Sequence, residues 1–178
     1  MHYLAQRSTS LMADKPRNGN GNGKANGKSN GKNGNGHAAP RLAGKVAIIT
    51  GAGRGIGHAT SMKFGHEGAY VIACDINADQ AQQTAQDVIE AGGEALGCHI
   101  DVRDPASIAR MVDTVVGKYG RIDCLVNNAF SFIAKGLDAT REDFERSFNV
   151  GPFAFALLTQ LVAEPMKKAG GGAIVNVS

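Results

Sequence analysis

Short apolar runs alternate with amphipathic stretches along the chain after Pro40. Such alternation indicates repeated strand–helix units that build a parallel sheet, so we expect an α/β fold of the Rossmann type, with a doubly wound parallel sheet. The first run, Val46–Ile49, is apolar at every position, which is typical of a central strand buried on both faces. The predicted strands are Val46–Thr50, Tyr70–Cys74, Ala95–Ile100, Cys124–Asn127 and Ala173–Val177.

Local signals also mark where helices begin and end. Asp104–Pro105 supplies an N-cap residue followed by proline at the first helical position, and Gly120 is expected to end that helix. Thr140 and Asp143 have the spacing of a capping box at the start of a last, long helix. Pro152 lies inside that helix, so we predict a local kink there.

A glycine-rich turn, Thr50-Gly-Ala-Gly-Arg-Gly-Ile-Gly57, follows the first predicted strand directly. Glycines permit a tight turn there and let backbone N–H groups and the positive end of the next helix approach a pyrophosphate closely. A P-loop is excluded, because no Gly-Lys-Ser/Thr ending is present. Glycines alone are a weak signal and a methyltransferase loop stays open, but a turn after a buried strand favours a dinucleotide site. Its candidate residues are Gly51, Gly53, Arg54, Gly55, Ile56 and Gly57.

An acidic residue, Asp75, follows the second predicted strand and precedes Ile76. Its carboxylate can accept hydrogen bonds from the ribose hydroxyls of adenosine, whereas a 2′-phosphate there would meet like charge. No arginine stands in the adjoining Ile76-Asn77-Ala78 segment. The sequence therefore favours NAD over NADP as the cofactor, with Asp75 and Ile76 in the site.

From Leu42 to Ser178 the chain resembles the short-chain dehydrogenase/reductase family in its NAD-preferring, single-domain form. The resemblance rests on the glycine turn, on Asp101-Val102 after the third strand, and on Asn127-Asn128-Ala129 after the fourth. It implies that Asp101 and Val102 lie against the adenine and that Asn128 and Ala129 belong to the cofactor site. Taken singly, Asp101 is also compatible with a turn former, and the asparagines with partners for backbone groups at the sheet edge. Phe130 stands where the family has glycine, so its ring narrows the substrate pocket or shifts the following loop.

Asn149 matches the asparagine of the family's catalytic tetrad, whose backbone carbonyl holds a water in a proton relay. The resemblance implies an oxidoreductase that interconverts a small-molecule alcohol and a carbonyl by hydride transfer, and a homo-oligomer when complete. The catalytic Ser and Tyr-x-x-x-Lys are not found, because Ser178 matches a non-catalytic serine and no tyrosine is followed by lysine four residues later. We therefore expect a fragment that is inactive alone. The alternative is a non-catalytic dinucleotide-binding or interaction protein.

Charge is unevenly distributed, since residues 1–44 hold seven Lys/Arg and one acid while the remainder is acidic overall. Asn18–Gly36 is a low-complexity tract with no apolar side chain larger than that of Ala25. It cannot bury enough surface to offset its ordering entropy, so we expect a disordered tail over 1–40 before a Rossmann domain over 41–178. The tract has no aromatic residue for base stacking, which disfavours nucleic acid as a partner.

The remaining chemistry-bearing residues point to no further site. The cysteines, Cys74, Cys98 and Cys124, lie in or beside predicted strands without CxxC spacing, so we expect buried free thiols in the reducing cytoplasm. The histidines are scattered, and we predict no metal site. No run approaches the ~20 apolar residues that cross a bilayer, so a membrane partner is not expected. Residues 1–13 contain a weak transit-peptide signal.

Overall fold

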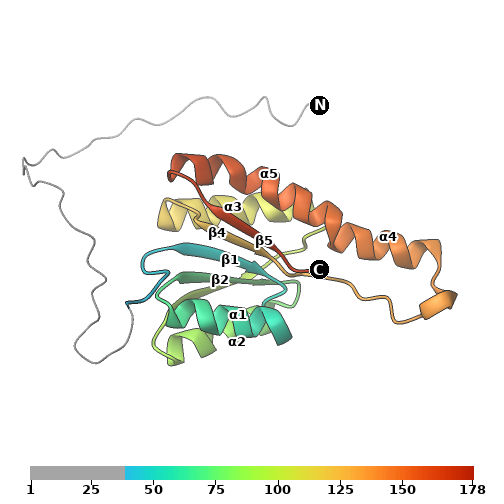
Figure 1. Ribbon diagram of the computed structural model, residues 1–178, viewed down its shortest axis with the longest axis horizontal. Helices are drawn as coiled ribbons and strands as arrows, with labels where there is room; N and C mark the ends of the chain where they lie inside the picture. The colour runs from blue at the N-terminus through green and yellow to red at the C-terminus, as the bar shows by residue number, and fades with distance from the viewer. Residues whose placement is uncertain (1–38) are drawn as a thin grey trace, which may run out of the picture. The chain divides into compact units, whose positions relative to one another are not determined.

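The computed structural model describes residues 39–178, so the predictions for the low-complexity tail lie outside the described residues. Five parallel strands form one sheet in the order β3-β2-β1-β4-β5 (Figure 1). The predicted Rossmann-type α/β fold is confirmed, and the predicted strand ends agree with the observed ones to within one residue. The strands are β1 Val46–Thr50, β2 Tyr70–Asp75, β3 Glu94–His99, β4 Cys124–Asn127 and β5 Ala173–Asn176.

Helices cover both faces of this sheet, as in a doubly wound fold (Figure 1). Alternate residues of β1 belong to two separate cores, with Ile49 packed toward α1 Gly55–His66 and α2 Ala78–Glu90, and Ile48 packed toward α3 Pro105–Tyr119 and α5 Pro152–Lys168. All five residues of β1 are buried, which confirms it as a central strand. Each fully buried aliphatic side chain contributes about 1.5–3 kcal/mol to the free energy of folding. Burial in the two cores therefore fixes the strands, and with them the strand ends at one edge of the sheet.

The predicted ends of α3 are confirmed. The carboxylate of Asp104 accepts hydrogen bonds from the N–H groups of Ala106 at 2.9 Å and Ser107 at 3.1 Å, and Pro105 is the first helical residue. Gly120 ends the helix with a φ of 73°, a left-handed conformation that glycine adopts without strain. Local sequence signals therefore suffice to bound this helix.

The prediction of one long, kinked helix after Thr140 is wrong. The structure has two helices, α4 Arg141–Val150 and α5 Pro152–Lys168, separated by Gly151 at φ −88° and ψ −107°. Pro152 has no N–H to donate to the carbonyl of Phe148, and it suits the first position of a new helix. The predicted capping box of Thr140 and Asp143 is confirmed, whereas Pro165 inside α5 has no counterpart in the sequence-based predictions.

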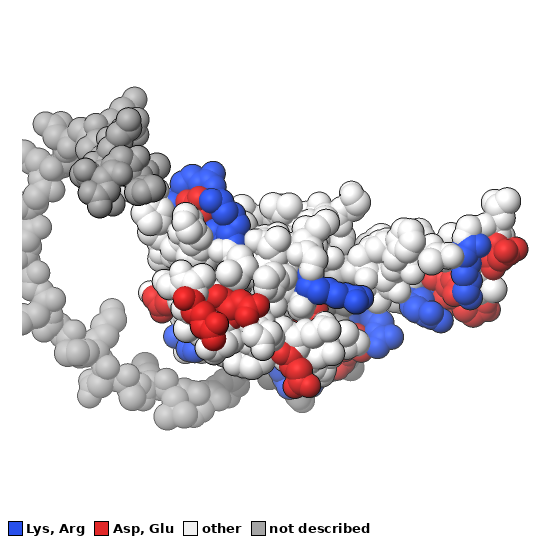
Figure 2. Space-filling model, turned by 90° about the horizontal axis from the view of Figure 1, so that it is seen from below, with Lys and Arg blue, Asp and Glu red and all other residues white. Residues whose placement is uncertain are grey.

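Residues 130–153, here called the arm, carry α4 and the short 3₁₀ helix Gly136–Asp138 away from the sheet (Figure 1). Within α4 only Asp143 and Ser147 are buried. Charged side chains of both signs gather at the outer end of the arm (Figure 2). Several large apolar side chains of the arm are half or more exposed, namely Phe130, Phe132, Leu137, Phe144, Phe148 and Phe153.

The three cysteines are free thiols, but the prediction that all are buried is wrong for two of them. Cys74 on β2 is fully buried, whereas Cys98 and Cys124 are half-buried. Cys98 is accessible because β3 is an edge strand, and Cys124 because it is the first residue of the short strand β4.

Candidate dinucleotide-binding site

The turn after β1 requires glycine for two different reasons. Gly51 and Gly55 have φ values of 63° and 58°, in the left-handed region that side chains disfavour. A Cβ atom on Gly51 would lie 2.8 Å from the Cα of Ala129, and one on Gly57 would overlap the carbonyl oxygen of Gly51. The turn is therefore both tightly curved and closely packed.

The N-terminus of α1 is open to an anion. The helix begins at Gly55, and a Cβ atom built on that residue would meet nothing within 4 Å. Its N-cap residue, Arg54, makes no side-chain capping hydrogen bond, and the first turn contains no acidic residue. The first backbone N–H groups and the positive end of the helix dipole thus have no side chain that neutralises them.

Asn128 holds the glycine turn against the end of β4. Its side-chain Nδ2 donates to the carbonyl oxygens of Thr50 and Gly51, both at 3.0 Å. In return, Thr50 Oγ1 accepts from the backbone N–H groups of Asn128 at 3.0 Å and Ala129 at 3.1 Å. We call these four hydrogen bonds the Thr50–Asn128 clasp. Sequence reasoning missed the role of Thr50, although a hydroxyl at the end of a buried strand, directly before the first glycine, was an available signal.

Asp75 lies at the carboxyl end of β2 and contacts the same turn. Its Oδ2 accepts from the N–H of Gly53 at 2.9 Å, and its Oδ1 accepts from the N–H of Asn77 at 2.9 Å. An ionised carboxylate has about four acceptor positions, so each oxygen keeps one for a ligand hydroxyl. Ile56 in the first turn of α1 and Ile76 directly after Asp75 are exposed by 64% and 58%.

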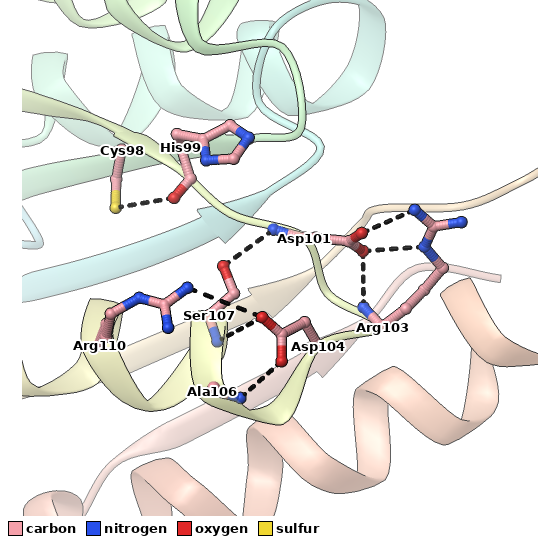
Figure 3. Close-up of polar contacts among 8 residues, drawn as sticks. All are labelled: Cys98, His99, Asp101, Arg103, Asp104, Ala106, Ser107 and Arg110. Carbon is pink, nitrogen blue, oxygen red and sulfur yellow. Dashed lines mark hydrogen bonds and ion pairs between the residues drawn. The ribbon is translucent and has the colours of Figure 1, made fainter.

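Asp101 and Val102 make contacts typical of a turn at the end of β3. Both carboxylate oxygens of Asp101 bind the guanidinium of Arg103, at 2.9 Å to Nε and 2.6 Å to Nη2, and this pairing lowers the pKa of Asp101 (Figure 3). The backbone N–H of Asp101 donates to Ser107 Oγ at 3.1 Å. Val102 is 7% exposed and packs into the core beneath α3. Within residues 39–178, the contacts of Asp101 are those of a residue that forms a turn after β3.

Asn149 is exposed in the last turn of α4, directly before the break at Gly151. It lines an open groove of about 710 Å³ on α4 and the start of α5, together with Arg141, Phe144, Glu145, Phe148 and Phe153. Phe130 connects this region to the end of β4, because its ring lies 3.3 Å from the position that a Cβ atom of Gly151 would take. The glycine turn, Asp75, Asn128 and Ala129 thus form one contacting group, and Asn149 belongs to the neighbouring arm.

Two further features can be stated for the described part of the chain. Among residues 39–178 no three His, Cys, Asp or Glu side chains come together in a way that could hold a metal ion. None of the helices in that range is long and apolar enough to span a bilayer.

Comparison with known proteins identifies the family. Residues 45–178 match the family model described as short chain dehydrogenase. The chain belongs to the short-chain dehydrogenase/reductase family. The family inferred from the glycine turn and the motifs after β3 and β4 is thereby confirmed, with a match that begins at residue 45 where the sequence predicted a start at Leu42.

Relatives in this family include several sugar-alcohol and steroid dehydrogenases. The chain is 41% identical over 138 residues to 7alpha-hydroxysteroid dehydrogenase of Escherichia coli K12, covering 78% of this chain and 54% of that protein. It is 41% identical over 140 residues to sorbitol dehydrogenase of Cereibacter sphaeroides, with the same coverage of both chains. The chain therefore spans about half the length of the curated relatives it matches.

Solved structures of family members share the fold. A 7 alpha-hydroxysteroid dehydrogenase complexed with NADH and 7-oxo glycochenodeoxycholic acid has a TM-score of 0.74 at 40% identity, over 79% of this chain and 55% of that one. A metagenomic short-chain oxidoreductase in complex with NADP has a TM-score of 0.71 at 33% identity, over 77% of this chain and 63% of that one. The family thus includes proteins that bind either nicotinamide dinucleotide.

Proposed function

We propose that this chain is the cofactor-binding part of an NAD-dependent short-chain dehydrogenase/reductase that interconverts an alcohol and a carbonyl. The observation that carries the proposal is the contact between the open glycine turn and Asp75. The N–H of Gly53 donates to Asp75 Oδ2 at 2.9 Å, which brings an anion-binding helix end and a ribose-binding carboxylate into one site.

Each part of this site has a separate task. The free N–H groups at the start of α1 bind the pyrophosphate, and the exposed side chains of Ile56 and Ile76 offer apolar contact to the adenosine half. Asp75 accepts hydrogen bonds from the two ribose hydroxyls and repels a 2′-phosphate, so NAD is preferred over NADP. We place Asp101 and Val102 beside the adenine, with Arg103 fixing the orientation of the Asp101 carboxylate. The bound nicotinamide supplies the hydride acceptor or donor.

The arm is proposed to support the proton-transfer half of the reaction. Asn149 would hold a water through its backbone carbonyl, which agrees with its place next to the interruption of the helix at Gly151. Phe130, packed on Gly151, would border the substrate at the nicotinamide end. The names of the relatives indicate substrates as different as hydroxysteroids and sorbitol, so we propose the class of small-molecule alcohols or carbonyls.

The exposed rings of the arm support the further proposal that the whole protein is a homo-oligomer. Phe148 and Phe153 lie with ring centroids 6.4 Å apart, and both are at least half exposed. Contiguous apolar surface of this kind is typical of contact surfaces between proteins.

The test of the proposed site is a comparison of NADH and NADPH binding by the 178-residue chain, measured by titration calorimetry. NADH should bind at least tenfold more tightly than NADPH, and Asp75→Asn should remove most of that difference by removing the repulsive charge. Asp79→Asn is the matched control, since Asp79 lies in the first turn of α2 and should leave the ratio unchanged. Tighter binding of NADPH by the unsubstituted chain would contradict the proposal.

A further inference from the structure

Cys74 and Cys98 are direct neighbours on adjacent strands. They are registered partners in the parallel pair of β2 and β3, and both side chains pack on the face of the sheet covered by α3. Neighbouring strands lie about 4.8 Å apart, and the Cα atoms of disulfide-bonded cysteines usually lie about 4.4–6.8 Å apart. The Cα spacing expected for this registered pair therefore falls within the range of disulfide-bonded cysteines.

The two thiols differ in their access to solvent. Cys74 is fully buried in the core, whereas Cys98 is half-buried on the edge strand β3. The Sγ atom of Cys98 lies 3.8 Å from the carbonyl oxygen of His99, as a close-up of this strand shows (Figure 3). A small dissolved oxidant can reach Cys98 but not Cys74.

The interaction between the two thiols shifts their pKa values in opposite directions and makes Cys98 the more acidic of the two. The neighbouring Cys74 thiol lowers the pKa of Cys98 to about 7. The same interaction, together with burial, raises the pKa of Cys74 well above its usual range. The lowered pKa gives Cys98 a larger thiolate fraction than Cys74 at any given pH, and thiolates are the form that reacts with peroxides.

We propose that Cys98 is a peroxide-reactive thiol that Cys74 resolves into a disulfide within the chain. In the first step the Cys98 sulfur attacks one oxygen of hydrogen peroxide, the O–O bond breaks, and hydroxide leaves. Cys98 is oxidised to a sulfenic acid, and the hydroxide takes up a proton from solvent to form water. In the second step the Cys74 sulfur attacks the Cys98 sulfur, the S–O bond breaks, and the departing hydroxyl leaves as water with the Cys74 proton. Two thiols and one peroxide thus give one disulfide and two waters.

Cys124 provides an internal comparison. It is also half-buried, but burial and the adjacent carboxylate of Asp123 raise its pKa. It has no cysteine partner across β4, since its registered neighbours are Ala47 on β1 and Ala173 on β5. Access to solvent alone would make Cys124 and Cys98 react alike, whereas the proposed pair makes Cys98 react first.

The experiment treats the 178-residue chain at pH 7 with hydrogen peroxide, then unfolds it, alkylates free thiols and maps the peptides by mass spectrometry. We expect a Cys74–Cys98 linked peptide, while Cys124 remains alkylated. Alkylation of all three thiols after a dose that oxidises free cysteine would overturn the proposal, as would a disulfide that joins two chains on a non-reducing gel.

Substituted chains separate the roles of the two sulfurs. Cys74→Ser should let a sulfenic acid accumulate at Cys98, where dimedone traps it, and Cys98→Ser should leave Cys74 alkylatable. Cys124→Ser is the matched control and should form the linked peptide as the unsubstituted chain does. Where a substituted chain fails to fold, the alkylation rates of Cys98 and Cys124 are compared in the folded, unsubstituted chain, and this comparison tests the proposal. A Cys98 that reacts no faster than Cys124 refutes the proposal.

Discussion

At the scale of single residues, the site depends on positions where one side chain, or the lack of one, sets the path of the backbone. Asn128 gives both of its amide hydrogens to the turn after β1, and Gly51 leaves room for Ala129. Both residues affect the shape of the site without having to contact a ligand. A site built in this way is sensitive to substitutions that change the turn rather than the chemistry of the site.

Replacement of Asn128 tests the Thr50–Asn128 clasp. Asn128→Ala removes the donors to the carbonyl oxygens of Thr50 and Gly51, and it should lower the free energy of unfolding by about 1–3 kcal/mol. Urea denaturation followed by circular dichroism measures this change. Gln160→Ala, on the exposed side of α5, is the matched amide control and should stay within about 0.5 kcal/mol. Equal effects of the two substitutions would show that the clasp contributes nothing.

Two glycines of the same turn should respond differently to alanine. At Gly55 the new Cβ meets open space, so Gly55→Ala should cost only the left-handed conformation, about 1–2 kcal/mol. Gly51→Ala adds a clash at 2.8 Å with the backbone of Ala129 and should cost clearly more. Thermal unfolding of both variants checks the order, and a larger drop in Tm for Gly55→Ala would contradict the described packing.

At the scale of elements, local signals account for most of what the sequence predicts correctly. The ends of α3 follow from Asp104, Pro105 and Gly120, and the capping box of α4 follows from Thr140 and Asp143, because caps involve residues within one turn of each other. At Gly151 the sequence does hold a local signal, Pro152, but the prediction from it was a kink and not the start of a new helix. The contact of Phe130 with Gly151 was not predictable from local signals, because the two residues are far apart in sequence.

In the candidate site, too, some features could be predicted from the sequence and others could not. The glycine turn and Asp75 were predictable, because both lie at the ends of strands that the apolar pattern already marks. The bidentate pairing of Asp101 with Arg103 and the burial of Val102 were not, because both depend on how the turn before α3 folds back on itself. Sequence reasoning therefore finds the residues of the site more readily than their partners.

Asp143 allows a measurement on the arm itself. Lys135 Nζ lies 2.8 Å from its Oδ2, and this hydrogen bond is the main cause that lowers the pKa of Asp143 to about 2. Because the folded pKa lies below the unfolded value of about 3.9, the contribution of Asp143 to stability is full above about pH 4–5 and is lost as the pH falls through the folded pKa.

Titration of Asp143 by carboxyl-detected NMR should give a pKa near 2. Lys135→Ala should raise that pKa, because the main hydrogen-bond donor is gone. Lys167→Ala is the control: it removes the partner of Glu164 on α5 and should leave the pKa of Asp143 unchanged. A normal pKa for Asp143 in the unsubstituted chain would show that the capped start of α4 does not hold this geometry in solution.

At the scale of the whole molecule, the described unit has a sheet whose central strands are buried and whose edge strand β5 is exposed. All four residues of β5 are exposed, including Ile174 and Val175, and several rings of the arm are exposed as well. Exposed apolar strands promote association between chains. The proposed binding of NAD and the solution behaviour of the chain are therefore best measured together, at low protein concentration.

Residues 1–178 alone should show no alcohol-dependent formation of NADH above the blank over a panel of secondary alcohols. None of Tyr3, Tyr70 and Tyr119 is followed by lysine at the fourth position, so we expect these residues to supply no general acid and base for the proposed reaction. Absorbance of NADH at saturating cofactor measures this, and the 7alpha-hydroxysteroid dehydrogenase of Escherichia coli serves as a positive control. Robust turnover by this chain would require another catalytic base.

The Thr50–Asn128 clasp has an entropic consequence for recognition. Its four hydrogen bonds join protein groups only, so they hold the turn in its curved conformation without any ligand. A preorganised loop does not lose backbone freedom on association, and rigid sites of this kind retain more of their contact energy as affinity. Amide hydrogens of Asn128 and Ala129 should accordingly exchange slowly with solvent in the free protein, and added NADH should slow them little further.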